Sequence, residues 1–459
     1  MQKHESGKGG GKRFVPKELR MLATARFLPL FVTQFLGAAN DHLLKTAVVM
    51  AALYRFDGGA DGAWVALAAP IALVLPFLFL SAIAGKMADS FDKAIIAKLV
   101  KGAEIIIMSA AAVAFMEESA LALLGCVAAM GVHSTFFGPV KYALLPQHLR
   151  DDELMKGNAM IEGATFLAIL AGTIAGGALM TDGVPISVAA AVCPVIACVG
   201  LAASLFIPAA PPTTEERIND EKRGETPRQG TIALIRWGWS DGTSLFAMLG
   251  ISWFCMIGAV FLGIFPTLVR DAIGGGEELV TALLALFSIF VGVGAMASAR
   301  LAPAPALRPL VGAISIMAAA LVGASAALPL AAAHGVAVPI EAMAFLGIPA
   351  SWPFLSCVAI AAAAGGAFSV PLYTLLQTAS DDATRARSIA CNNVTNALFA
   401  AFGMAGTHGL LKLGASQTQA IAFLGLLALI AALAATGLAR KLAPSLLRPG
   451  RRSEAPNAD

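Results

Sequence analysis

Hydrophobic residues come in long, continuous runs along this 459-residue chain, and short polar stretches separate the runs. A helix needs roughly 20 apolar residues to cross the hydrocarbon part of a bilayer. The strands of a membrane β-barrel would instead alternate apolar and polar residues. The pattern predicts twelve membrane-spanning helices, at residues 27–53, 64–84, 94–115, 119–142, 158–180, 186–207, 244–269, 280–300, 309–330, 352–378, 388–411 and 417–438.

Composition supports the same fold class. Hydrophobic residues make up 58% of the chain and charged residues 13%, and the mean hydropathy is +0.77. Soluble domains carry about 25% charged residues. A chain this apolar cannot cover itself with a water-facing surface, so we expect an all-α membrane protein with two pseudo-symmetric bundles of six helices.

The widest polar gap divides the chain near its middle. We expect a cytoplasmic tail, an N-terminal six-helix bundle, a cytoplasmic linker, a C-terminal six-helix bundle and a second cytoplasmic tail. Within the linker, Thr231 to Trp239 places apolar residues on one helical face, which predicts an interfacial helix. The five segments are residues 1–26, 27–207, 208–243, 244–438 and 439–459.

The placement of positive charge predicts the topology. With twelve spans and both termini inside, the only Lys and Arg residues on the outside are Arg55, Arg270 and Lys412, and Lys45 lies within the first span. Loops on the cytoplasmic side of membrane proteins are enriched in Lys and Arg. We therefore expect a multi-pass protein of the bacterial inner membrane, with both termini in the cytoplasm.

An internal repeat relates the two halves. Tyr142-Ala-Leu-Leu-Pro-Gln is followed by Asp151-Asp152, and Tyr373-Thr-Leu-Leu-Gln is followed by Asp381-Asp382. The two copies lie about half the chain apart, at the ends of spans four and ten. Two related six-span halves with a substrate site between them at mid-membrane are typical of secondary transporters.

The loop after span two resembles the signature G-x-x-x-D-[RK]-x-G-[RK] of the major facilitator superfamily. Gly85, Asp89 and Lys93 match it, while Ser90 and Asp92 depart from it. The resemblance implies the major facilitator fold. We expect the loop to act in conformational change, with Asp89 facing a basic group or a helix N-terminus in one state only.

A narrower resemblance is carried by Asn40-Asp41 in span one and by Gly138-Pro139-Val-Lys141-Tyr142 in span four. These stretches are similar to the lysophospholipid transporter family, which includes members fused to acyltransferase and acyl-ligase domains. The resemblance implies movement of lysophospholipids to the inner leaflet for reacylation. It also implies that Asp41 and Lys141 contribute to the polar site, although an arginine of that family on span seven has no counterpart here.

Ionisable residues inside the spans indicate a substrate path, because an unpaired charge in the bilayer costs about 3 kcal/mol. Asp41 and Lys45 are four residues apart and can pair across one helical turn. Lys141 suits a phosphate, and Asp41 suits an ammonium group; a structural ion pair and a snorkelling lysine are the alternatives. The predicted substrate-binding residues are Asp41, Asn40, Lys45, Lys141 and Glu162.

Other polar residues lie at the inner ends of the repeat-related spans. We expect an inner gate there, with simple interhelical hydrogen bonding as the alternative. The predicted gate residues are Tyr142, Tyr373, Gln377, Asn158 and Asn393. Lys98, Lys101 and Glu104, at the start of span three, are interpreted as snorkelling or structural residues and not as catalytic ones.

The sequence excludes several function classes. It has no P-loop motif and no H-x-x-x-x-D acyltransferase motif, so we expect a transporter and not an enzyme. No His/Cys cluster suggests a metal, no cofactor is expected, and no basic patch with interleaved aromatics suggests nucleic acid. We expect a monomer whose substrate is a membrane lipid or another amphiphile, with a separate acyltransferase as a candidate partner. The alternative functions are a proton-coupled exporter of drugs or metabolites and a non-transporting receptor.

Overall fold

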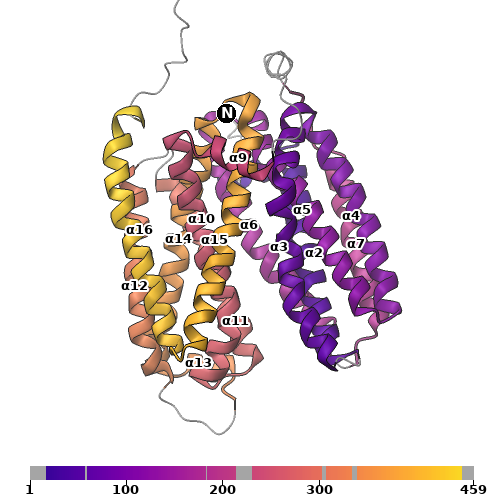
Figure 1. The fold of residues 1–459 in the computed structure, drawn as a ribbon, viewed down its shortest axis with the longest axis vertical. Coiled ribbons are helices and arrows are strands. Elements are labelled where there is room, and N and C mark those ends of the chain that lie inside the picture. The colour runs from indigo at the N-terminus through magenta and orange to yellow at the C-terminus, as the bar shows by residue number, and fades with distance from the viewer. Residues whose placement is uncertain are drawn as a thin grey trace, which may run out of the picture.

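The computed structural model describes residues 17–56, 59–181, 183–212, 230–301, 307–332 and 339–446, and it is built of helices (Figure 1). Within these residues the one β interaction is an isolated bridge between Gly275 and Ile340. The predicted tails and linker lie partly outside the described residues. The N-terminal half contains α1 (Lys17–Leu22), α2 (Leu28–Tyr54), α3 (Gly59–Ser90), α4 (Lys93–Met116), α5 (Ala120–His148), α6 (Asp151–Ala178) and α7 (Ile186–Ser204).

The second half repeats this arrangement of long helices after a short helix, α9 (Thr231–Gly238), at the place predicted for an interfacial helix. Three short helical turns, η1 (Leu268–Ile273), η2 (Pro349–Ser351) and η3 (Asp382–Thr384), join its elements. The remaining helices are α10 (Gly242–Thr267), α11 (Glu277–Leu301), α12 (Leu307–Ala332), α13 (Ala342–Leu346), α14 (Trp352–Ala379), α15 (Arg385–Lys412) and α16 (Gln417–Leu446).

A long helix occupies the place of each of the twelve predicted spans. Among the described residues, ten of these helices are long and apolar enough to cross a membrane. The other two, α2 and α15, are of similar length but carry more polar side chains in their middle turns, such as Asp41 and Asn393. The chain is therefore an all-helical, multi-pass membrane protein, and a count of twelve crossings stays a prediction.

The long helices pack as two bundles. The N-bundle consists of α2 to α7. In it, α2 packs against α3, α5, α6 and α7, and α4 packs against α5 and α7. Helix α10 packs against α14 and α15, which form the C-bundle with α11, α12 and α16. The bundles meet along α6 with α11 and along α3 with α15. Helices α2 and α10, which begin the two bundles, do not pack closely on each other.

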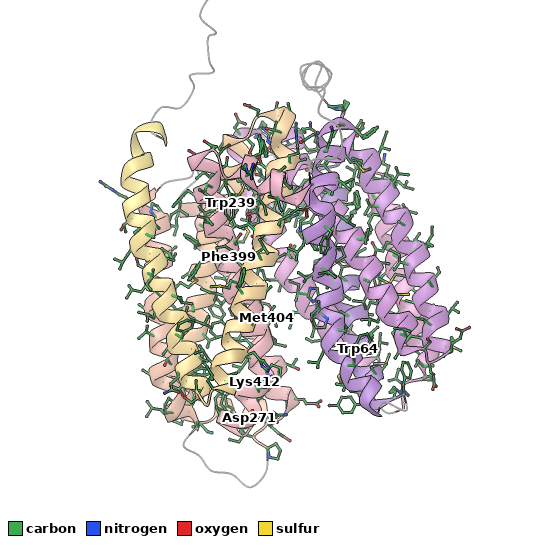
Figure 2. The ribbon with its side chains drawn as sticks, in the orientation of Figure 1. Trp64, Trp239, Asp271, Phe399, Met404 and Lys412 are labelled. Atoms are coloured by element: carbon green, nitrogen blue, oxygen red, sulfur yellow. The ribbon has the colours of Figure 1, made fainter. Side chains whose placement is uncertain are left out.

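The two ends of the molecule differ. Figure 1 shows α9 at one end, here called the linker end, and α13 at the opposite end, here called the far end. Figure 2 shows Trp239 toward the linker end, and Trp64, Asp271 and Lys412 toward the far end. Between the ends the outer surface is apolar, and its exposed side chains include Leu67 (75% exposed), Ile106 (72%) and Leu433 (64%). Tryptophans near both ends and an apolar middle are typical of a surface that contacts lipid.

Small residues let helices of the N-bundle approach closely. A Cβ atom added to Gly176 of α6 would lie 2.5 Å from the carbonyl oxygen of Leu43 on α2, while one added to Gly177 would meet nothing within 4 Å. Close backbone approach of this kind strengthens helix packing in membranes, where the hydrophobic effect between helices is absent. It holds α2, which carries Asp41, against α6.

Candidate functional site

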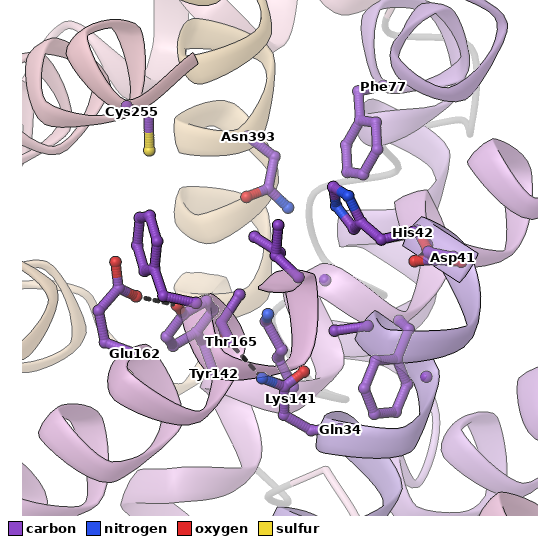
Figure 3. Close-up of a pocket in the computed structure, with 18 of the residues that line it drawn as sticks. Gln34, Asp41, His42, Phe77, Lys141, Tyr142, Glu162, Thr165, Cys255 and Asn393 are labelled. Atoms are coloured by element: carbon purple, nitrogen blue, oxygen red, sulfur yellow. Dashed lines mark hydrogen bonds between the residues drawn. The ribbon is translucent and has the colours of Figure 1, made fainter. Parts of the chain in front are cut away.

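A cavity of about 360 Å³ lies between the two bundles and is lined by residues of α2, α3, α5, α6, α10, α14 and α15 (Figure 3). Apolar side chains such as Phe77, Phe166 and Leu262 form much of its wall. A mostly apolar pocket with a few convergent polar groups is the usual form of a small-molecule site. The polar groups in this wall include Gln34, Asp41, Lys141, Tyr142, Glu162 and Asn393.

Asp41 lies in the middle of α2 and faces the cavity. Its Oδ2 accepts a hydrogen bond from Ser134 Oγ at 2.5 Å, while its buried Oδ1 has no hydrogen-bond partner among the described residues. The expected pair between Asp41 and Lys45 does not form, because Lys45 Nζ lies 3.2 Å from His42 Nδ1 instead. Asp41 thus lines the cavity with a buried carboxylate oxygen to which no described residue donates.

The predicted ligand Asn40 does not line the cavity. Its side chain is buried on the other face of α2, where Nδ2 donates to Glu104 Oε1 at 2.8 Å and to the Cys193 carbonyl at 3.2 Å. Adjacent residues on a helix point about 100° apart, so Asn40 and Asp41 serve different surroundings. Asn40 has a place inside the N-bundle and Lys45 lies beside His42, so neither reaches the cavity wall.

Lys141, Tyr142 and Glu162 form a connected group in the wall of the cavity. Lys141 Nζ lies 5.0 Å from the centre of the Tyr142 ring, and the Tyr142 hydroxyl donates to Glu162 Oε2 at 3.1 Å. Within the part of the chain that the structure describes, no carboxylate lies within ion-pair distance of Lys141. The cavity therefore contains an ammonium group and two carboxylates that protein ion pairs do not neutralise.

The repeat-related tyrosines meet at the interface of the bundles. The rings of Tyr142 and Tyr373 stack with their centres 4.4 Å apart and an angle of 9° between their planes. Both residues are about 95% buried. A stacked aromatic pair contributes about 0.5–1.5 kcal/mol beyond the area that it buries. This pair forms part of the cavity wall where the two bundles meet.

A hydrogen-bond network lies next to the tyrosine pair, further toward the linker end. Asn158 Nδ2 donates to Gln377 Oε1 at 2.6 Å and to Thr374 Oγ1 at 3.0 Å. Gln377 Nε2 donates to the carbonyl of Tyr142 at 3.0 Å. The network joins α5 and α6 of the N-bundle to α14 of the C-bundle, and Asn158 and Gln377 are buried. Asn393, predicted as a gate residue, instead lines the cavity.

The signature loop makes a second contact between the bundles. Asp89 accepts hydrogen bonds from the backbone N–H groups of Ala386 at 2.8 Å and Arg387 at 3.1 Å, at the first turn of α15. Its Oδ2 also lies 3.2 Å from Arg387 Nε. A carboxylate at a helix N-terminus satisfies free N–H groups and interacts favourably with the helix dipole. Asp89 therefore has both kinds of partner that the sequence predicts for it.

Of the other two signature residues, Gly85 borders this contact and Lys93 lies outside it. Gly85 lies where a Cβ atom would come within 2.7 Å of the Ala390 Cβ, so α3 and α15 approach closely there. Lys93 begins α4, and its backbone N–H donates to the Ala210 carbonyl at 3.1 Å. Asp92, which replaces the usual glycine of the signature, caps α4 by accepting from the Ala94 N–H at 2.8 Å.

Sequence reasoning missed a buried ionic cluster behind the cavity. Lys101 and Glu104 form an ion pair in which both side chains are 0% exposed, so of the two interpretations of Lys101, snorkelling is wrong and a structural role agrees with the ion pair. His133 Nε2 lies 3.2 Å from Glu104 Oε2. The cluster contains no metal-binding group of three His, Cys, Asp or Glu residues, nor does the rest of the described chain.

Comparisons with known proteins give the chain its relatives. A family model described as the Major Facilitator Superfamily matches residues 30–351. The lysophospholipid transporter LplT of Yersinia enterocolitica is 27% identical over 357 residues, which cover 78% of this chain and 80% of the relative. The lysophospholipid transporter LplT of Serratia proteamaculans is 27% identical over 280 residues, which cover 61% of this chain and 67% of the relative.

Solved structures share the fold. The human organic anion transporter MFSD10 matches with a TM-score of 0.67 and 16% identity, over 92% of this chain and 100% of that one. A bacterial homologue of the iron transporter ferroportin, in an outward-facing state, matches with a TM-score of 0.65 and 15% identity, over 91% of this chain and 99% of that one. At these identities the likeness concerns the fold alone.

The comparisons confirm the resemblance that the sequence motifs indicate. The relatives and structural neighbours are transporters and not enzymes. The family model covers well over half of the chain, from the first turn of α2 to the end of η2, directly before α14. The chain belongs to the major facilitator superfamily.

Proposed function

We propose that this transporter moves zwitterionic lysophospholipids, such as lysophosphatidylethanolamine, across the membrane by alternating access between its two bundles. The relatives that are named as lysophospholipid transporters support this substrate class. The observation that carries the proposal is the cavity, which combines the carboxylate of Asp41 with the ammonium of Lys141. A headgroup with one ammonium and one phosphate is complementary to that pair.

Each charge has an assigned role. The free Oδ1 of Asp41 accepts the headgroup ammonium, and Lys141 donates to a phosphate oxygen. Asn393, whose Nδ2 is buried without a hydrogen-bond partner in the described chain, can donate to the glycerol or ester oxygens. Charge-assisted hydrogen bonds in a site with little water are strong. The acyl chain stays against the apolar surface, so the cavity needs to hold only the polar part of the lipid.

The contacts between the bundles describe one of the two states that alternating access requires. Tyr142 with Tyr373, Asn158 with Gln377, and Asp89 with the first turn of α15 join the bundles near the linker end. The proposed transport cycle breaks these contacts and opens the cavity at that end. The predicted gate residues thus act as the seal, except Asn393, which acts in the site.

The distribution of basic residues supports a cytoplasmic linker end in a bacterial inner membrane. The far end carries few of them, namely Arg55, Arg270 and Lys412. Cytoplasmic loops are the ones enriched in Lys and Arg. In this orientation the lipid would reach the inner leaflet, where a separate acyltransferase could consume it. The basic residues near the linker end include Arg20, Arg26, Lys86, Arg150, Lys156 and Arg387.

The test is uptake of headgroup-labelled lysophosphatidylethanolamine by proteoliposomes. We expect the wild type to move the lipid and Asp41→Asn and Lys141→Ala to lose at least about 30-fold in rate, since removing one partner of a buried charge pair costs about 2–5 kcal/mol. Lys412→Ala removes an exposed charge at the far end and should retain wild-type uptake.

The possible outcomes separate the candidate functions. Wild-type rates in a correctly inserted Asp41→Asn or Lys141→Ala protein would remove that residue from the site. Absence of lipid movement in the wild type, together with efflux of a soluble cation, would favour the exporter.

A further inference from the structure

Four polar side chains, Asp41, Ser134, His133 and Glu104, lead in this order from the cavity into the N-bundle; they are called the polar series below. Ser134 Oγ donates to Asp41 Oδ2 at 2.5 Å, and the same hydroxyl lies 3.5 Å from His133 Nδ1. The opposite ring nitrogen, His133 Nε2, lies 3.2 Å from Glu104 Oε2. Three helices, α2, α4 and α5, thus place four polar side chains in series.

The end of the polar series inside the N-bundle, at His133 and Glu104, can hold a positive charge. Glu104 accepts from Lys101 through Oε2 and from Asn40 at 2.8 Å through Oε1. His133 Nε2 faces the same carboxylate at an ion-pair distance, although its N–H is not aligned for a hydrogen bond.

The end of the polar series at the cavity is Asp41, whose carboxylate carries a negative charge that needs to be neutralised. Asp41 is without an ion-pair partner in the described structure, and an unpaired carboxylate inside a membrane is unfavourable. A bound cation or a proton can remove that cost. The other titratable groups that surround Asp41 and His133, taken from each helix of the N-bundle that packs there, are His42, Lys45, Lys101, Glu104, Lys141, Glu162 and Cys193.

We propose that Asp41 carries a proton that moves through Ser134 to His133 when a cationic group binds at Asp41, and that returns when the cation leaves. With the proton on Asp41 the direction of the hydrogen bond between Asp41 and Ser134 is reversed, so that Asp41 Oδ2–H donates to Ser134 Oγ, and the Oδ2–H bond breaks as its proton passes to Ser134 Oγ. The hydroxyl proton of Ser134 passes at the same time to His133 Nδ1. The products are the Asp41 carboxylate, which pairs with the cation, and an imidazolium at His133, which faces Glu104.

The hydroxyl of Ser134 suits this role because one O–H group can donate while its oxygen accepts, and its hydrogen rotates freely. The proton has no route to water through the cluster, since the side chains of Lys101 and Glu104 are 0% exposed and that of His133 is 2% exposed. Binding of a cation therefore releases no proton to the medium. The identity of the cation as a lipid ammonium rests on the proposed function, but the proton on Asp41 does not.

The first test needs no lipid. Infrared spectroscopy of the purified protein near neutral pH should show a carboxylic-acid band in the wild type that is missing in Asp41→Asn. The absence of that band in the wild type would overturn the inference, whatever the substrate proves to be.

The second test uses lysophosphatidylethanolamine as the probe and a pH-indicator dye in weakly buffered solution, with binding measured in parallel. The wild type should bind without releasing a proton, and its affinity should not change with pH. In His133→Asn the displaced proton has no acceptor, so about one proton should be released per bound lipid and affinity should fall about tenfold per unit of acidification.

Two further variants control for structure. Ser134→Ala removes the connecting hydroxyl, keeps both end groups and should release a proton as His133→Asn does. His408→Asn removes an exposed histidine of α15 that is not part of the wall of this cavity, and it should behave as the wild type. The inference would be overturned if the wild type released a proton on binding, or if His133→Asn and Ser134→Ala released none. A lack of lipid binding in every protein would contradict the proposed function and leave the infrared result to decide the inference.

Discussion

The contact between Asp89 and α15 gives a quantitative prediction. Asp89 is 2% exposed and accepts from two backbone N–H groups and Arg387 across the bundle interface. Asp89→Asn keeps the shape and one carbonyl oxygen but removes the charge. Loss of the interaction with the helix N-terminus costs about 0.3–2 kcal/mol, and loss of a charged partner for Arg387 adds to that. A total of about 2 kcal/mol shifts the equilibrium away from this closed state about 30-fold.

Cys255 offers a direct assay because it lines the cavity. In a variant whose other five cysteines are replaced, a membrane-impermeant thiol reagent should label Cys255 from the linker side about 30 times faster after Asp89→Asn. Asp92→Asn is the matched control, because Asp92 bonds to Ala94 and Ala210, which lie in the N-terminal half. An unchanged labelling rate in Asp89→Asn, or an equal increase in Asp92→Asn, would refute the reasoning.

Two further predictions concern stability and are measured as the midpoint of thermal unfolding in detergent. Lys101→Met and Glu104→Leu should each be strongly destabilising, by about 3–5 kcal/mol, while the double variant should be less affected than either, because only the single variants leave an unpaired buried charge. A double variant that is as unstable as the sum of the singles would contradict this account. Gly176→Ala should lower the midpoint, because its Cβ would overlap the Leu43 carbonyl, whereas Gly177→Ala has free space and should leave the midpoint unchanged. Equal effects of the two alanines would show that close packing against α2 is not what Gly176 provides.

The sequence predicts the helices and much of the interface between the bundles. Continuous apolar runs locate the long helices because lipid requires apolar side chains and internally satisfied backbone groups. The repeat places Tyr142 and Tyr373 at matching positions, and the structure stacks their rings. Such equivalence is visible in sequence because both copies keep the same residue at the same distance from the end of a helix.

The direction in which a charged side chain points could not be predicted from its own helix. Lys101 points inward because glycines on two distant helices leave space for it: a Cβ at Gly37 would lie 3.2 Å from its Nζ, and one at Gly200 would lie 2.9 Å from it. Lys45 is one turn from Asp41 but contacts His42, which is closer along the helix. Spacing on one helix restricts which groups can meet, and packing between helices decides which of them do.

The arrangement of the cavity between the bundles also determines what a substrate can do. A ligand changes a conformational equilibrium only by the difference between its affinities for the two states. The proposed seal at the linker end combines a tyrosine stack, a buried amide network and a capped helix, so opening it would cost several kcal/mol by the magnitudes above. A ligand that touched only the N-bundle would keep the same contacts in both states and could not provide that difference. Because the cavity wall includes Asp41 from one bundle and Asn393 and Tyr373 from the other, a headgroup bound as proposed would contact both bundles, and its interactions would change as the bundles move relative to each other.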